Sequence, residues 1–136
     1  MELFARVCRV TGTVGWPVND SPKKLAYADP PYYGQGKRLY GKLHPEADIW
    51  DDVDTHLSLL WGMDENYDGW AYCMTTTSLA LILPNAPECR VAAWVKPFAA
   101  WRPNHRVQYT WEPVLFKTSL PRGGRGIDSV RLVRLS

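Results

Sequence analysis

The chain has 136 residues, of which 46% are hydrophobic and 22% are charged, so it is long enough for one domain with a buried core. No apolar stretch approaches the roughly 20 residues of a membrane span, and the N-terminus lacks the continuous apolar segment of a secretory signal. Three cysteines without paired spacing favour free thiols in a reducing cytoplasm.

The net charge of +2 hides a segregation of charge along the chain. Residues 1–42 carry a net charge of +4, residues 43–89 carry −9 with neither lysine nor arginine, and residues 90–136 carry +7. Charge runs of this kind are often only solvated faces. The alternative is that the two basic ends converge on one surface that meets a polyanion.

The first half of the chain predicts a strand followed by a helix. Residues 23–28 are an apolar run typical of a short strand that ends at Asp29. Residues 44–62 predict the longest helix, because Pro45 suits its first position, Gly62 suits its end, and apolar residues recur on one face.

The second half continues the alternation. We expect a strand over 69–75 and a short helix over 76–83 that is capped by threonine and stopped by Pro84. Strands over 89–98 and 107–118 lie close enough in sequence to form an antiparallel hairpin at one edge.

This order of elements predicts the fold class. Strand, helix, strand, helix, strand indicates an α/β fold with a Rossmann-like, mostly parallel sheet and an antiparallel edge hairpin. We expect one domain over residues 1–120 and a basic, Gly/Arg-rich C-terminal tail over 121–136.

The stretch YADPPYYGQGKRLYG, residues 27–41, is the main candidate site. It places Asp29 at the carboxyl end of the first predicted parallel strand, where open α/β sheets bind ligands. Pro30 and Pro31 stiffen the segment and lack N–H donors, so it presents a carboxylate and carbonyl oxygens. Such acceptors suit an exocyclic amine, beside which Tyr32 offers a flat face. We interpret the stretch as a site rather than a plain turn.

The motif resembles the D-P-P-[YFW] of amino-methyltransferases, which methylate N6 of adenine or N4 of cytosine in DNA with S-adenosylmethionine. Together with WDD…H, GWA…SLALILP, RVAAWVKPFA and YTWEPVLF, it is similar to small DNA methyltransferase-like proteins of actinobacterial and phage type over about residues 25–120. The resemblance implies the catalytic half of a seven-strand methyltransferase sheet. It also implies a cytoplasmic DNA methyltransferase, with N6 of adenine as the favoured target.

The resemblance assigns the catalytic role to Asp29, Pro30, Pro31 and Tyr32. The Asp29 carboxylate and the Pro30 carbonyl would accept hydrogen bonds from the amine of a base flipped out of the duplex. Tyr32 would stack on that base. The mechanism needs no metal.

Basic residues are the candidate contacts to DNA phosphates. They follow the motif or lie in the last third of the chain: Lys37, Arg38, Lys42, Lys96 and Arg102. Gly34, Gly36 and Gly41 predict a flexible lid that closes over the flipped base.

Other polar and aromatic residues have structural interpretations. Glu112 is expected to accept from a lysine or a backbone amide. His44 is read as a helix cap and His56 as an exposed helix residue, and neither has a cysteine at zinc-like spacing. Packing, rather than base stacking, is expected of three tryptophans: Trp94, Trp101 and Trp111.

The chain departs from the family pattern in its cofactor half. The family has a glycine loop after a strand that approaches the methionine part of S-adenosylmethionine, whereas RGGRG (122–126) follows no apolar strand. The cofactor-binding residues are therefore unknown, and we expect weak cofactor binding by the isolated chain.

The same departure predicts an open sheet edge beside residues 24–28, which must be covered. A second copy in a homodimer, a partner chain, or residues 4–14 would cover it. The alternative function is a catalytically inactive, methyltransferase-like module that binds DNA or protein.

Overall fold

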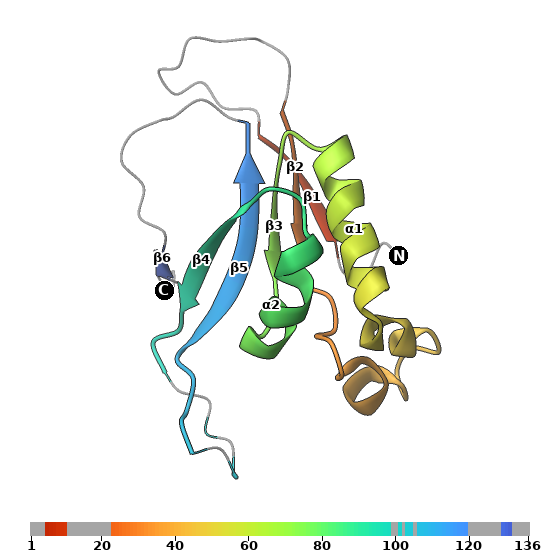
Figure 1. Ribbon diagram of the computed structural model, residues 1–136, viewed down its shortest axis with the longest axis vertical. Helices are drawn as coiled ribbons and strands as arrows, with labels where there is room; N and C mark the ends of the chain where they lie inside the picture. The colour runs from red at the N-terminus through yellow and green to blue at the C-terminus, as the bar shows by residue number, and fades with distance from the viewer. Residues whose placement is uncertain are drawn as a thin grey trace.

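A computed structural model describes residues 5–10, 23–98, 101, 103–104, 106–119 and 129–131, with the backbone alone for 5–10, 23 and 129–131. Its centre is a six-stranded sheet in the order β1-β2-β3-β5-β4-β6 (Figure 1). The strands are β1 (Ala5–Val10), β2 (Lys23–Ala28), β3 (Gly69–Cys73), β4 (Arg90–Val95), β5 (Trp111–Thr118) and β6 (Ser129–Arg131).

The sheet is mixed, so the prediction of a mostly parallel sheet is wrong. β2 pairs with β3 in parallel and β4 with β6 in parallel, whereas β1–β2, β3–β5 and β4–β5 are antiparallel. The predicted hairpin of β4 and β5 is present, but β5 lies inside the sheet between β3 and β4. A strand that returns through a hairpin must run antiparallel to its predecessor, and here it also runs antiparallel to β3.

Strand β1 covers the edge of β2 that the sequence predicts to be open. The register runs from Ala5 opposite Ala28 to Val10 opposite Lys23. This confirms that residues within 4–14 fold across as a strand. A second copy or a partner chain is therefore not required at this edge.

The helices are α1 (Val53–Asn66) and α2 (Thr76–Ile82), with short turns η1 (Gly36–Tyr40), η2 (Ala47–Asp51) and η3 (Leu83–Asn85). Of these turns, η1 is π-helical, and η2 and η3 are 3-10 helices.

The predicted helix over 44–62 is wrong at both ends: it begins only at Val53, after the extended Asp52 (φ −109°, ψ 131°), and it continues past Gly62 to Asn66. The residue at its N-cap is Asp52, so His44 is not its cap. The Trp50 carbonyl accepts a hydrogen bond from His56 Nε2 (2.7 Å). This carbonyl is thereby satisfied at a point where no continuous helix supplies a backbone donor.

The short helix α2 forms as the sequence predicts. The Thr75 hydroxyl accepts from the backbone N–H of Ser78 (3.2 Å), which is the expected threonine cap. Pro84 follows in η3, where the helix has already ended.

The core lies between the sheet and the two helices. β2 presents Ala26 and Ala28 to this side, next to Trp70 and Tyr72 of β3. Five further side chains complete the core, from α1, the segment after β3, α2 and β5: Leu60, Met63, Met74, Ile82 and Leu115. Helices α1 and α2 also contact each other (Figure 1).

Residues 129–131, which the sequence assigns to the tail, form β6 beside β4. The rest of the predicted tail over 121–136 lies outside the described residues.

Candidate functional site

The ends of four neighbouring strands lie together at one end of the sheet. The carboxyl end of β2 pairs with that of β3, with Ala28 opposite Tyr72. The amino end of β5 lies at the same end, since Val114 is opposite Cys73. The carboxyl end of β4 joins them, with Val95 opposite Trp111. The segments that follow β2, β3 and β4, and the start of β5, are thus brought together.

The Asp-Pro-Pro-Tyr segment leaves β2 at this end in a non-helical conformation. Pro30 and Pro31 are buried, and Tyr32 is half-buried. The Tyr32 carbonyl accepts from the backbone N–H of Gln35 (2.8 Å), which closes the turn after the motif. The prediction that the motif directly follows the carboxyl end of a strand, outside any helix, is confirmed, whereas the sheet is mixed rather than parallel and the next α-helix begins only at Val53.

Glu112 fixes the position of Tyr32. The Tyr32 hydroxyl donates to Glu112 Oε2 (3.0 Å), and Lys96 Nζ lies 2.5 Å from Glu112 Oε1. Lys96 Nζ is also 5.1 Å from the centre of the Trp94 ring. The lysine partner predicted for Glu112 is therefore present, and the carboxylate links the motif to β4.

Asp29 lies in the electrostatic field of this group. Partial burial raises the pKa of the Asp29 carboxyl; the Tyr32 hydroxyl lowers it, the negative charge of Glu112 raises it, and Lys96 lowers it. Burial also raises the pKa of the Tyr32 phenol, with Asp29 and Glu112 adding to the effect. At neutral pH the phenol thus remains a hydrogen-bond donor.

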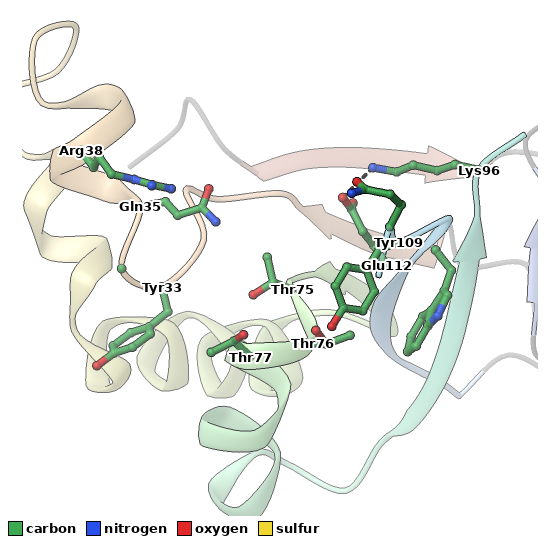
Figure 2. A pocket seen from close by; sticks show the side chains of 12 residues that line it. Tyr33, Gln35, Arg38, Thr75, Thr76, Thr77, Lys96, Tyr109 and Glu112 are labelled. Atoms are coloured by element: carbon green, nitrogen blue, oxygen red, sulfur yellow. Dashed lines mark hydrogen bonds and ion pairs between the residues drawn. The ribbon is translucent and has the colours of Figure 1, made fainter. Parts of the chain in front are cut away.

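A cleft of about 510 Å³ opens at Glu112 and Lys96, whereas the motif residues 29–32 are not among those that line it. Figure 2 shows Tyr33, Gln35 and Arg38 on one side of it, with Lys96, Tyr109 and Glu112 on the other. Between them lie the threonines at the start of α2, Thr75 to Thr77, and the lining is completed by Gly34, Gln108 and Trp111. The volume is within the range of pockets for small ligands, but most of the lining side chains are polar or charged, with three aromatic rings among them.

The wall that carries Gln35 and Arg38 is held by Asp51. The backbone N–H groups of Gly36 and Lys37 donate to Asp51 Oδ1 (2.7 Å) and Oδ2 (3.0 Å). A Cβ on Gly36 would lie 2.1 Å from the Ala47 carbonyl oxygen, so this glycine permits close backbone approach.

The glycines of the predicted lid therefore have different roles. Gly36 is buried in packing between η1 and η2, and Gly41 is similarly close to the Lys37 carbonyl. Gly34 has φ +74° with open space around it. Glycine adopts this left-handed conformation more readily than residues that carry a Cβ. The segment after the motif is a folded wall of the cleft.

The candidate DNA contacts lie at several places. Lys37, Arg38 and Lys42 are exposed, and Arg38 reaches the cleft. Lys96 lines the same cleft from β4 but is paired with Glu112. Arg38 comes from the first basic segment and Lys96 from the last, so both segments reach this cleft. Arg102 lies outside the described residues.

The predicted packing of tryptophans is wrong for Trp101. This side chain is 79% exposed, in the connection between β4 and β5, which places it away from the core. Trp111 is 37% exposed and lines the cleft. Trp94 is half-buried, and its Nε1 is buried without a hydrogen-bond partner among the described residues.

His56 is buried (1% exposed), which corrects its prediction as an exposed residue. Its ring is hydrogen-bonded through Nδ1 to the Tyr72 hydroxyl, and Nε2 lies 2.7 Å from the Trp50 carbonyl oxygen. Because a carbonyl only accepts, Nε2 carries the proton and Nδ1 accepts from Tyr72. Burial lowers the pKa of His56, against the opposing effects of the Trp50 carbonyl and of Asp52 and Asp51.

Two further residues lie near the strand ends. The Tyr27 hydroxyl and the Cys73 Sγ are 3.3 Å apart. Burial raises the pKa of the Cys73 thiol to about 11, so it is not an activated nucleophile. Cys73 and Cys89 are both free thiols.

Several site residues escape prediction from the sequence. Tyr33, Gln35 and the threonines of α2 reach the cleft only because the chain folds them there, although the second tyrosine of PPYY is a signal for Tyr33. In the described part of the chain, no group of three or more His, Cys, Asp or Glu residues is placed to hold a metal ion. Within those same ranges, no helix has the length and apolarity to cross a membrane.

Comparison with known proteins gives no relative: no family model, no curated protein and no solved structure matches the chain.

Proposed function

We propose that this chain provides the target-amine site of a DNA amino-methyltransferase, with N6 of adenine as the favoured target. One observation carries the proposal. Glu112, which lines the cleft, accepts a hydrogen bond from the Tyr32 hydroxyl (3.0 Å) and so ties the Asp-Pro-Pro-Tyr segment to the cleft. The residue types of the motif and their position at the carboxyl end of β2 are those that recognition of an exocyclic amine needs.

The chemistry of the amine explains the residues. The Asp29 carboxylate and the Pro30 carbonyl accept hydrogen bonds from the amine. They orient the lone pair of its nitrogen toward the methyl group that is transferred. As the nitrogen gains positive charge during methyl transfer, these acceptors stabilise it. The Asp29 pKa is raised from 3.8, so the carboxylate form that this role requires is lost at acidic pH.

The Tyr32 hydroxyl, which is hydrogen-bonded to Glu112, contributes to the same methyl-transfer step. A tyrosine whose hydroxyl is anchored keeps its ring in one orientation, so a base that stacks on it meets a fixed surface. Lys96 holds the other oxygen of Glu112, which keeps that carboxylate in place.

S-Adenosylmethionine is the proposed methyl donor, whose sulfonium supplies an electrophilic methyl group. The described residues do not fit its binding half, since they contain no glycine loop directly after a strand, and β1 pairs with the edge of β2. The residues that hold the donor would lie outside the described ranges or on another chain. We therefore derive only the recognition of the amine from this chain.

DNA is the proposed partner of the basic residues beside the cleft. The exposed Lys37, Arg38 and Lys42 follow the motif directly, so a target nucleotide in the cleft would bring its phosphates near them. Arg102 and Lys96 belong to the same proposal.

A second function, a methyltransferase-like module without catalysis, is favoured by one observation. β1 occupies the sheet edge at which a cofactor half would continue the sheet. Such a module would keep the cleft and its basic rim, and it would bind DNA or protein without methyl transfer.

Recognition of the amine can be tested with two nucleosides, adenosine and purine riboside, which lacks the 6-amino group. NMR titration should show tighter binding of adenosine, and Asp29→Ala should remove the difference, because the lost carboxylate is the group that reads the amine. Asp54→Ala, an exposed aspartate on α1, is the matched control. Equal binding of the two nucleosides by the wild-type chain would refute the proposal.

Calorimetry with S-adenosylmethionine tests whether the donor site lies within this chain. We expect weak binding by the isolated chain and no detectable methyl transfer to DNA. Tight binding would show that the donor site lies within this chain. Methyl transfer that Asp29→Ala abolishes, while DNA affinity is kept, would exclude the non-catalytic module.

A further inference from the structure

The connection between β4 and β5 carries large apolar side chains in solvent. Phe98 is 64% exposed, Trp101 79% and Val107 69%. In Figure 1 this connection extends from the end of β4 away from the helices and the rest of the sheet. Asn104 lies in it with a left-handed φ of 71°, which asparagine tolerates in turns. Three large, exposed apolar side chains within one connection are candidates for contact with a partner.

The chemistry of the segment favours a polyanion with flat, apolar parts. Residues 97–110 contain two arginines and a histidine but no aspartate or glutamate. Among the described residues of the connection, Arg106 is exposed beside Val107. Basic residues interleaved with exposed aromatic rings are the pattern of surfaces on which unpaired bases stack while cations meet the phosphates.

Aromatic side chains where the same connection meets β5 line the cleft. Tyr109 is 52% exposed and Trp111 37% exposed, and both line the cleft next to Glu112. Figure 2 shows Tyr109 on the side of the cleft that faces Arg38. The connection therefore joins the cleft, through Tyr109, to the exposed Phe98 and Trp101 along the chain.

We propose that the β4–β5 connection binds single-stranded DNA, by stacking unpaired bases on Trp101 and Phe98 next to the nucleotide in the cleft. A duplex keeps its base faces stacked and hidden, so it offers no ring faces to these side chains, whereas a single strand does. The inference rests on the proposed function for the choice of DNA. It goes beyond that function by making unpaired DNA the preferred substrate.

The test measures binding of labelled oligonucleotides by fluorescence anisotropy, without S-adenosylmethionine. Single-stranded DNA, the duplex of the same sequence and the RNA of the same sequence are compared. Trp101→Ala should weaken binding of single-stranded DNA by about 5- to 150-fold, the range for one stacked base. Trp101→Tyr should keep most of the affinity. Trp61→Ala, an exposed indole on α1, is the matched control and should keep all of it.

Salt dependence separates stacking from charge. Arg106→Gln should weaken binding and reduce the slope of log affinity against log salt by about 0.7, the value for one phosphate contact on a single strand. Trp101→Ala should leave this slope unchanged, because a stacked ring releases no counterion.

Four results would overturn the inference. These are equal or tighter binding of the duplex, tighter binding of the RNA, equal effects of Trp101→Ala and Trp61→Ala, or light scattering in which Trp101→Ala converts a dimer of the chain to a monomer. The last result would assign the surface to protein association. Because the test uses neither nucleosides nor the methyl donor, it can succeed or fail independently of amine recognition by Asp29.

Discussion

Replacing Gly36 by alanine should destabilise the wall of the cleft. The new Cβ would lie 2.1 Å from the Ala47 carbonyl oxygen, so η1 and η2 must separate by about 1 Å to reach even the shortest contacts that real Cβ atoms make. Such overpacking costs about 1–3 kcal/mol. The shift also stretches the hydrogen bonds that the N–H groups of Gly36 and Lys37 donate to Asp51, now 2.7 and 3.0 Å. We expect the free energy of unfolding to fall by about 2–4 kcal/mol.

Two other glycines provide matched controls in the same urea denaturation experiment. Gly62 lies within α1 with nothing near its missing Cβ, so Gly62→Ala should raise the free energy of unfolding by about 0.5–1 kcal/mol. Gly34→Ala meets no atom but keeps the left-handed φ, at a cost of about 1–2 kcal/mol. The reasoning is refuted if Gly36→Ala is as stable as the wild type, or more stable than Gly34→Ala.

Further predictions concern the ionisable groups of the site and core. Glu112→Gln should lower the pKa of Asp29 relative to the wild type, because the negative charge of Glu112 raises it, and Lys96→Met should raise this pKa, because Lys96 lowers it. ¹³C NMR titration of the Asp29 carboxyl measures both shifts. An unchanged titration in both variants would contradict the geometry. Burial holds the pKa of His56 below its usual 6.5, so the unfolded chain binds more protons just below that pH. The free energy of unfolding should therefore fall as the pH drops below 6.5, which urea denaturation at several pH values can measure. In His56→Gln this fall with pH should be smaller. An equal fall in the variant would show that His56 is not its source.

Local patterns in the sequence predict those elements that depend on neighbouring residues. The strand that ends at Ala28 precedes Asp29 as expected, since the prolines that follow cannot continue a ladder. Helix α2 begins after Thr75, whose side chain caps it. The strand over 5–10 covers β2, which is one of the three alternatives expected for this edge.

Long-range contacts decide what the sequence leaves open. A helix over 44–62 satisfies local preferences, but the extended Asp52 separates η2 from α1. Hydrogen bonds from Gly36 to Asp51 and from His56 to Trp50 hold η2 in this position. A hairpin can be predicted from the short connection between its strands. Its insertion between β3 and β4 cannot, because strand order depends on which edge accepts a partner.

The sequence by itself determined the motif at Asp29 and its position at the end of a strand, because proline and aspartate act on the backbone within a few residues. Only the tertiary structure brought Glu112 to Tyr32, 80 positions away, and placed Lys96 beside it. It also buried His56 and left Trp101 in solvent. Burial and pairing between distant residues depend on how the sheet is ordered, and no local pattern specifies that order.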